Sequence, residues 1–191
     1  RQIHPTEEAL AALKLVEPPA WVNNDLKRKI AVTALPDKAS LKIDEKSAAL
    51  VEERLRKLPW LTNVFVETTA KGILISVDYR QPVAVIETPS SKDGCYYLSR
   101  DMVVLDYMPM EGLPIVEITG MTSLGYLSPG QTLKNEDIST AMDILDKLLG
   151  MDRDMVRRGD PPLMPEIKSI DVSNLDGRRD VKKPHIVLRA A

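Results

Sequence analysis

The 191-residue sequence is poor in the side chains that most often carry out chemistry. It contains one cysteine, Cys95, and two histidines, His4 and His185. A catalytic triad or a zinc site needs a histidine held among convergent partners, and no local motif places either histidine in that way. Cys95 has no second thiol with which to form an intrachain disulfide, and we interpret it as a small buried hydrophobe in an apolar strand. The sequence therefore predicts no catalytic residue and no metal ligand.

Phosphate-binding loops and stacking aromatics are also missing. Neither a Gly-x-Gly-x-x-Gly motif nor a Walker loop occurs, so we predict no cofactor and no small-molecule substrate. Aromatic residues make up 4% of the chain and the net charge is −2. This balance argues against nucleic acid as a partner, because phosphate binding draws on clustered basic side chains and aromatic platforms. The short basic stretch at 177–183 contains an aspartate, and we interpret it as a solvated turn.

Long hydrophobic runs are the third absence. No stretch approaches the roughly 18 apolar residues that span a bilayer, and no signal peptide is found. The sequence begins at Arg1 rather than at a methionine. We therefore expect a piece of a longer protein, whose association with a membrane would come only from an anchor upstream of residue 1.

Helical patterns dominate the first part of the chain. Residues 6–15 start with an N-cap threonine and acidic residues, and they predict a helix. Residues 24–34 fit either a short helix or a strand. Segment 44–58 is the clearest helix, because apolar residues recur at three- and four-residue spacing behind the capping residue Asp44.

The apolar period changes to two from Leu61 onward. Residues 62–69 and 73–80 predict the two strands of a β-hairpin, joined by a short connection that contains Gly72. The apolar face of this hairpin is expected to pack on the helix at 44–58.

Pro82 interrupts the strand pattern. Proline has no backbone N–H, so it is confined to sheet edges, bulges and strand starts. We interpret Pro82 as the seam between the hairpin and a second module. Three strands that form an antiparallel meander are predicted beyond it, at 83–88, 95–99 and 102–107.

The rest of the chain predicts three more strands and one helix. The strands are expected at 112–120, 166–174 and 185–190, and the last two are joined by a charged loop. The helix at 134–150 is capped by Asn135 or Asp137 and ends at Gly150. The predicted fold class is α+β: helices packed on a small mixed sheet, followed by an antiparallel or mixed β-domain with a flanking helix.

Residues 57–87, KLPWLTNVFVETTAKGILISVDYRQPVAVIE, resemble a known family in the order and spacing of their elements. A helix ends in LPWL, a strand and a turn follow, and a second strand closes on Pro-Val-Ala. The later segments CYYLS, RDMVVLD and LPIVEITG continue the likeness. The chain is similar here to the extracytoplasmic regions of the bacterial cell-division proteins FtsQ and DivIB.

This resemblance implies a division of the chain and a role. It implies a polypeptide-transport-associated (POTRA) module at 22–81, which in the family opens with a strand, and a β-domain at 82–191, after an N-terminal helical segment at 1–21. Such proteins are single-pass inner-membrane proteins with this region on the extracytoplasmic (periplasmic) side. They are not enzymes but scaffolds of the divisome, and the β-domain binds FtsB/FtsL-type partners.

The last strand is the candidate site of partner binding. A mixed sheet leaves at least one edge with unpaired backbone groups, and a partner can use that edge by adding a strand. The candidate edge comprises His185, Ile186, Val187, Leu188 and Arg189, with Ile186 and Leu188 on one face. An inner strand whose neighbour lies beyond residue 191 explains the same pattern. Tyr79 and Arg80, which end the hairpin strand, are further candidate contacts.

Two other function classes fit the same sequence. One is a POTRA-containing component of outer-membrane protein assembly or secretion, although the part after residue 83 does not repeat the part before it. The other is an envelope enzyme whose site is assembled from scattered residues and would need a deep pocket with convergent polar groups.

Overall fold

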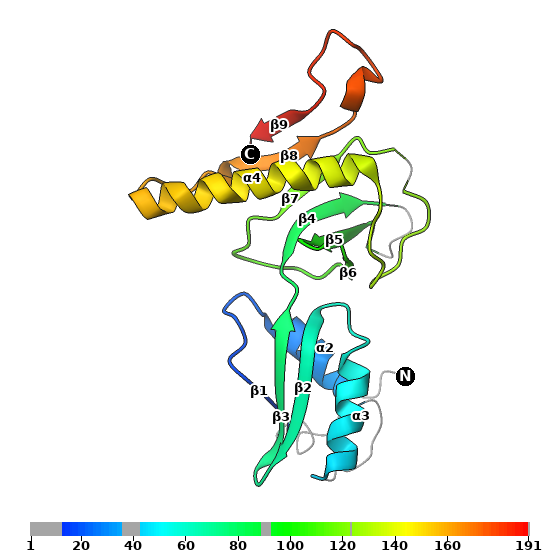
Figure 1. Ribbon diagram of the computed structural model, residues 1–191, viewed down its shortest axis with the longest axis vertical. Coiled ribbons are helices and arrows are strands. Elements are labelled where there is room, and N and C mark those ends of the chain that lie inside the picture. The colour runs from blue at the N-terminus through cyan, green and yellow to red at the C-terminus, as the bar shows by residue number, and fades with distance from the viewer. Residues whose placement is uncertain (1–12, 36–42, 89–92, 123, 191) are drawn as a thin grey trace. The chain divides into compact units, whose positions relative to one another are not determined.

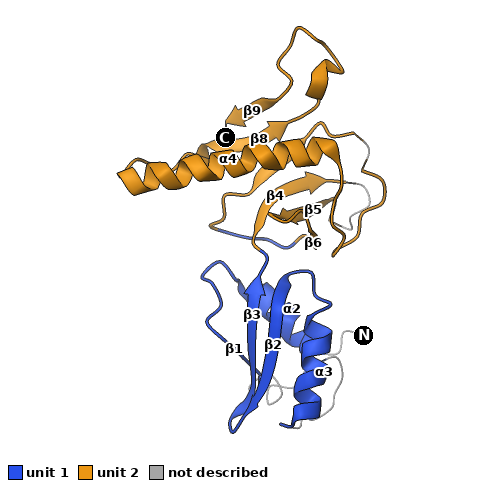
Figure 2. Cartoon of the chain, viewed as in Figure 1, with its two compact units in different colours: residues 1–80, 108–111 blue, residues 81–107, 112–191 orange. Residues whose placement is uncertain are grey.

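The computed structural model describes residues 13–35, 43–88, 93–122 and 124–190. The chain forms two compact units (Figure 2). Unit 1 comprises residues 1–80 and 108–111, and unit 2 comprises residues 81–107 and 112–191. The predicted α+β class is confirmed, because the described residues form three α-helices and two mixed sheets (Figure 1).

Unit 1 contains a three-stranded sheet in the order β1-β3-β2. Its strands are β1 (Leu13–Leu15), β2 (Leu61–Thr69) and β3 (Gly72–Tyr79). The predicted hairpin is confirmed as the antiparallel pair β2–β3, which closes from Thr69 to Gly72. Strand β1 runs parallel to β3 on its other side.

The predicted helix at 6–15 is wrong for its last three residues. Leu13, Lys14 and Leu15 are paired with residues 73–75 of β3, so the strand ladder prevails over their helical propensity. Residues 6–12 lie outside the described residues, as does most of the predicted N-terminal segment 1–21.

Two capped helices cover the unit 1 sheet. Helix α2 (Asn24–Ala34) begins where the Asn23 side chain accepts a hydrogen bond from the Leu26 amide, at 2.9 Å. Its buried residues recur every fourth position, which decides the helix–strand ambiguity at 24–34 in favour of a helix. Helix α3 (Glu45–Leu55) is capped by Asp44, as predicted, and packs against β2. Trp60 is completely buried in this unit.

Unit 2 contains a six-stranded mixed sheet in the order β6-β5-β4-β7-β8-β9. The strands are β4 (Pro82–Glu87), β5 (Cys95–Ser99), β6 (Val104–Asp106), β7 (Val116–Thr119), β8 (Ile167–Asp171) and β9 (Val187–Ala190). The antiparallel meander β4–β5–β6 is confirmed. Strand β7 lies parallel between β4 and β8, and β9 runs antiparallel to β8. Pro82 is the first residue of β4, a position where proline is tolerated.

The long helix α4 (Glu136–Arg158) flanks the unit 2 sheet. Asn135 is its N-cap, since its side chain accepts from the Ile138 amide at 3.1 Å. The predicted end at Gly150 is wrong: the helix continues for two more turns and ends at Gly159, which adopts φ 84°. A residue with left-handed backbone angles at the end of a helix is usually glycine, as at Gly159. A glycine inside a helix, such as Gly150, lowers helix stability only modestly, so the helix can continue through it.

The core of unit 2 lies between α4 and the sheet. Ile138, Met142 and Leu145 of the helix pack with Ile86 and Ile118 of the central strands. Two short 3-10 turns, Met164–Glu166 and Leu175–Gly177, lead into and out of β8. In the part of the chain that the structure describes, no helix is both long and apolar enough to cross a membrane.

Candidate interaction surface at the edge strand β9

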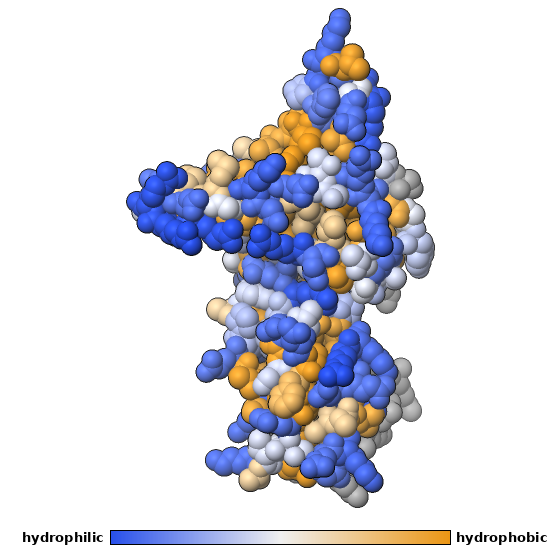
Figure 3. Space-filling view, in the orientation of Figure 1, coloured by the Kyte–Doolittle hydropathy of each residue, from blue (hydrophilic) through white to orange (hydrophobic). Residues whose placement is uncertain are grey.

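Strand β9 is the outer strand of the unit 2 sheet within the described residues. Its one strand neighbour there is β8. All four of its residues are exposed, and the apolar Val187 and Leu188 have 38% and 46% of their surface accessible. In the space-filling view, hydrophobic residues gather over β8 and β9 (Figure 3). The candidate surface therefore combines an open backbone edge with exposed apolar side chains.

The register of β9 places its side chains on two faces. Leu188 lies opposite Ile170, which is completely buried, and Val187 lies opposite Asp171. The strand begins at Val187, two residues later than predicted. His185 is exposed ahead of it, and Ile186 is partly buried against the hydrophobic core. Of the two apolar residues predicted to contact a partner, Ile186 therefore packs against the core and Leu188 lies on the surface.

Arg189 is held by an ion pair across the sheet. Its guanidinium donates to Oδ2 of Asp171 at 2.8 Å, and Asp171 Oδ1 accepts from the Ser173 amide at 2.9 Å. These contacts, the Arg189 bond foremost, lower the pKa of the Asp171 carboxyl to about 2. The pair links the side chains of β9 and β8 on one face of the sheet.

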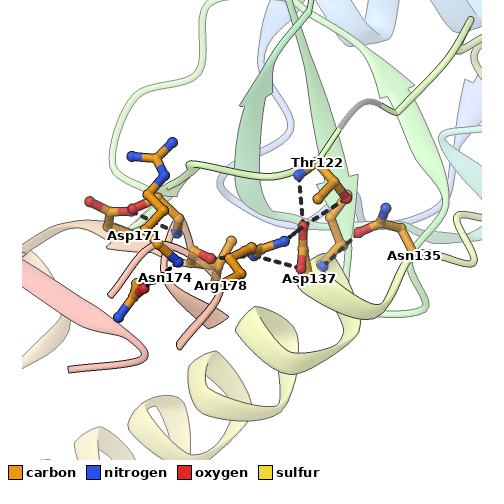
Figure 4. A network of polar contacts seen from close by, with 10 residues as sticks. Thr122, Asn135, Asp137, Asp171, Asn174 and Arg178 are labelled. Atoms are coloured by element: carbon orange, nitrogen blue, oxygen red, sulfur yellow. Dashed lines mark hydrogen bonds and ion pairs between the residues drawn. The ribbon is translucent and has the colours of Figure 1, made fainter. Parts of the chain in front are cut away.

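A second ion pair anchors the connection between β8 and β9 to helix α4 (Figure 4). Arg178 donates two bonds to the Asp137 carboxylate, at 2.8 and 3.0 Å. Asp137 also accepts from the amide and the hydroxyl of Thr122, at 2.7 and 2.9 Å. Burial alone would raise the pKa of Asp137, but the bonds from Arg178 and Thr122 outweigh it and lower that pKa.

Asn174 organises the rest of this connection. Its side-chain oxygen accepts from the amides of Arg179 and Asp180, at 2.9 and 2.8 Å. Its side-chain nitrogen donates to the carbonyls of Asp180, Lys183 and Pro184, at 2.9 to 3.2 Å. The side chain of Asn174, labelled in Figure 4, therefore holds together the loop that leads into β9.

The interpretation of 177–183 as only a solvated turn is wrong for Arg178. The Arg178 side chain is 29% exposed and the Asp137 side chain is 5% exposed, so the pair is largely buried. The two residues lie 41 positions apart. No local motif links residues at that separation, so this contact could not be predicted from the sequence.

Tyr79 and Arg80, the other candidate contacts, lie in unit 1. Arg80 donates from its guanidinium to the carbonyls of Pro59 and Leu61, at 2.8 and 3.1 Å. The Tyr79 ring meets the Trp21 ring edge-on at 6.1 Å, and burial raises the pKa of its hydroxyl. Both side chains therefore make contacts inside unit 1, whereas β9 belongs to unit 2.

Cys95 is the single thiol of the chain. It is partly buried, not fully buried as predicted, and this burial, with the charges of Asp93 and Glu87, raises the pKa of its thiol. A raised thiol pKa disfavours the nucleophilic thiolate. Within the described ranges, no group of three or more histidine, cysteine, aspartate or glutamate residues is placed to hold a metal ion.

Comparison with models of protein families and with curated proteins gave no match to this chain.

Proposed function

We propose that this chain is the extracytoplasmic part of a non-enzymatic scaffold of the bacterial cell-division machinery, similar to FtsQ. In this proposal a single-pass anchor precedes the chain, and the chain lies on the periplasmic side of the inner membrane. Strand β9 recruits FtsB/FtsL-type partners by accepting an added strand.

The observation that carries the proposal is the open edge of β9. An exposed edge strand is usually blunted by charge, proline or a covering element. Here the edge presents Val187 and Leu188 next to the ion-paired Arg189, and the Arg178–Asp137 pair and the Asn174 amide hold the loop that leads into the strand. An open edge suits strand addition, because backbone bonds hold the partner and alternate side chains select it.

The order of elements in unit 1 supports the resemblance stated above. The family module opens with a strand, and β1, which lies ahead of the expected start at residue 22, precedes the two helices and the hairpin. The helices pack on a small mixed sheet, as expected for a POTRA module. Unit 2 has a different sheet order from unit 1, which disfavours a tandem array of such modules in the described residues.

The proposal is tested by pull-down of an FtsB–FtsL-type pair encoded in the same genome. We expect the chain to retain the pair and Leu188→Asp to reduce the retained amount at least about tenfold, because the partner would have to desolvate an unpaired charge. Leu188 is 46% exposed, so the unfolding midpoint of the variant should stay close to that of the wild type.

The matched control is Val181→Asp, which places the same charge on an exposed residue of unit 2 outside β9. Val181 is 80% exposed. We expect it to bind the pair like the wild type. Equal retention by folded Leu188→Asp and wild type would reject β9 as the binding edge. If the wild-type chain does not bind the pair, the proposed scaffold function is wrong.

A further inference from the structure

The β1–α2 pocket lies in unit 1, between strand β1 and helix α2. Strand β1 is the outer strand of this sheet on the side of β3 that faces away from β2 (Figure 1). The pocket encloses about 380 Å³. Small-molecule sites typically have volumes of roughly 300–1,000 Å³. The pocket is therefore large enough to hold a small ligand.

The floor of the pocket belongs to the core of unit 1. Ile30 of α2 and Ile75 of β3 line it, and each is 1% exposed. Leu15 of β1 lies opposite Ile75 in the register, so the two side chains point to the same face of the sheet. Leu13, two positions before Leu15, points to that face as well. Both leucines line the pocket and are only partly buried. The pocket is therefore an apolar extension of the core.

A small residue of α2 leaves this space open. Lys27 and Ala31 are four positions apart, so they lie on one stripe of the helix, beside its buried stripe. Ala31 lines the pocket with a single methyl group, which leaves a gap between the helix and the leucines of β1. Pro18, in the segment after β1, adds a further apolar wall with a fixed backbone angle.

Within the described residues, two cations line the pocket and no carboxylate does. They are Lys27 and Arg28, consecutive exposed residues of α2. Arg28 lies 3.8 Å from Asp25, and both side chains are more than half exposed, so this ion pair is weak. Lysine and arginine pack their aliphatic stems on apolar surface and keep their charged ends in water. The pocket therefore has an apolar interior and a cationic rim.

This combination indicates the chemistry of a ligand. In the part of the chain that the structure describes, the lining side chains include no hydroxyl, amide or other neutral polar group. A hydrocarbon chain needs no such partner, and its transfer from water into an apolar pocket is favourable. A carboxylate at the end of the chain can accept charge-assisted hydrogen bonds from the two cations. A peptide, by contrast, carries backbone groups that these side chains cannot pair.

We propose that the β1–α2 pocket binds a fatty acid, with its hydrocarbon chain against Leu13, Leu15 and Ile75 and its carboxylate at Lys27 and Arg28. The bound chain buries the two partly exposed leucines and completes the packing of this end of unit 1. The site does not use the β9 edge, so it stands or falls separately from the proposed function.

The test titrates the full chain with decanoate, held below the concentration at which it forms micelles. We expect saturable binding in which the methyl resonances of Ile30, Ile75 and the β1 leucines shift most. Decanol has the same chain without the charge, and it should bind at least about tenfold more weakly. Acetate has the charge without the chain, and it should produce no saturable shift. Equal affinity for decanoate and decanol, or shifts confined to other elements, would overturn the proposal.

A double variant tests the cationic rim. Lys27→Gln combined with Arg28→Gln keeps two long side chains and removes both charges. We expect it to bind decanoate at least about tenfold more weakly and decanol like the wild type. The matched control is Lys46→Gln, at an exposed lysine of α3, which should leave the affinity for decanoate unchanged. Wild-type affinity for decanoate in the double variant would contradict the proposal.

A filling variant tests the apolar interior. Ala31→Phe places a ring in the space between α2 and β1, and we expect it to abolish the binding of both decanoate and decanol. The control is Val32→Phe at the next position of α2, where the side chain is 39% exposed; it should bind decanoate like the wild type. Full binding of decanoate by a folded Ala31→Phe chain would reject the pocket as the site.

Two measurements on the wild-type chain need no filling variant. Intermolecular nuclear Overhauser effects should connect the decanoate chain with the methyl groups of Ile30 and Ile75, and their absence at saturation would reject the site. Vesicles of phosphatidylglycerol test whether the two cations serve a membrane surface instead. If the vesicles bind the wild type but not the double variant, while decanoate shifts none of the pocket resonances, the proposal is wrong.

Discussion

Arg178 and Asp137, 41 residues apart, form a two-bond ion pair that fastens the β8–β9 connection to the first turn of α4. The Asp137 carboxylate is 5% exposed, so loss of its partner leaves a charge with little water to solvate it. The contact thereby joins helix α4, which forms part of the unit 2 core, to the loop that precedes the proposed binding strand.

We predict that Arg178→Ala lowers the free energy of unfolding by about 2–4 kcal/mol, because it leaves the buried carboxylate without its strongest donor. Urea denaturation measures the change. The control is Arg179→Ala, the exposed neighbour whose backbone rather than side chain bonds to Asn174. If both variants unfold at the same urea concentration, the ion pair contributes no net stability.

The pH dependence of stability should contain a contribution from Asp171. Its pKa is about 2 in the folded chain, against an ordinary value of 3.8. A carboxyl whose pKa is lowered by folding stabilises fully above its unfolded pKa, and this contribution is lost as the pH falls from about 4 toward about 2. Asp171→Asn should therefore cost stability at neutral pH and progressively less on acidification. Urea denaturation at several pH values compares the two chains. A difference that is constant from neutral pH to pH 2 would contradict this assignment.

Gly120 has no room for a side chain. It adopts φ 76°, and a Cβ there would lie 2.5 Å from Ser173 Cβ and 2.6 Å from the Ser173 amide nitrogen. Gly125 has a similar φ of 66° with nothing within 4 Å of the same position. We expect Gly125→Ala to cost about 1–2 kcal/mol from backbone strain alone, and Gly120→Ala to cost more. Thermal unfolding measures both variants, and equal midpoints would show that the close approach relaxes without penalty.

Trp60 tests the core of unit 1. Its side chain is completely buried, so Trp60→Ala should lower the free energy of unfolding by about 3–5 kcal/mol through lost burial and the cavity left behind. Phe65→Ala is the matched aromatic truncation, at an exposed site on β2, and we expect it to cost less than about 1 kcal/mol. A thermal midpoint of Trp60→Ala close to that of the wild type would contradict the prediction.

Much of the local structure follows from the sequence. The spacing of apolar residues and the caps Asp44 and Asn135 predicted the helices, and period-two alternation predicted the hairpin and the meander. These signals are readable because each depends on neighbours within one or two turns. The end of α4 was predicted wrongly, because the sequence offers Gly150 as a stop signal ahead of Gly159. Only the continuous helix across Gly150 shows that Gly159 is the C-cap.

The sequence by itself determined the β2–β3 hairpin, the β4–β5–β6 meander and the presence of the helices α3 and α4, and it marked Pro82 as the start of a new sheet. Only the tertiary structure decided that Leu13–Leu15 join β3, that Arg178 is bound by Asp137, and that Ile186 packs inward while Leu188 stays exposed. Propensity and periodicity are properties of adjacent residues. Strand order, buried ion pairs and free edges depend on which distant segments meet, and that is settled by the packing of the whole sheet.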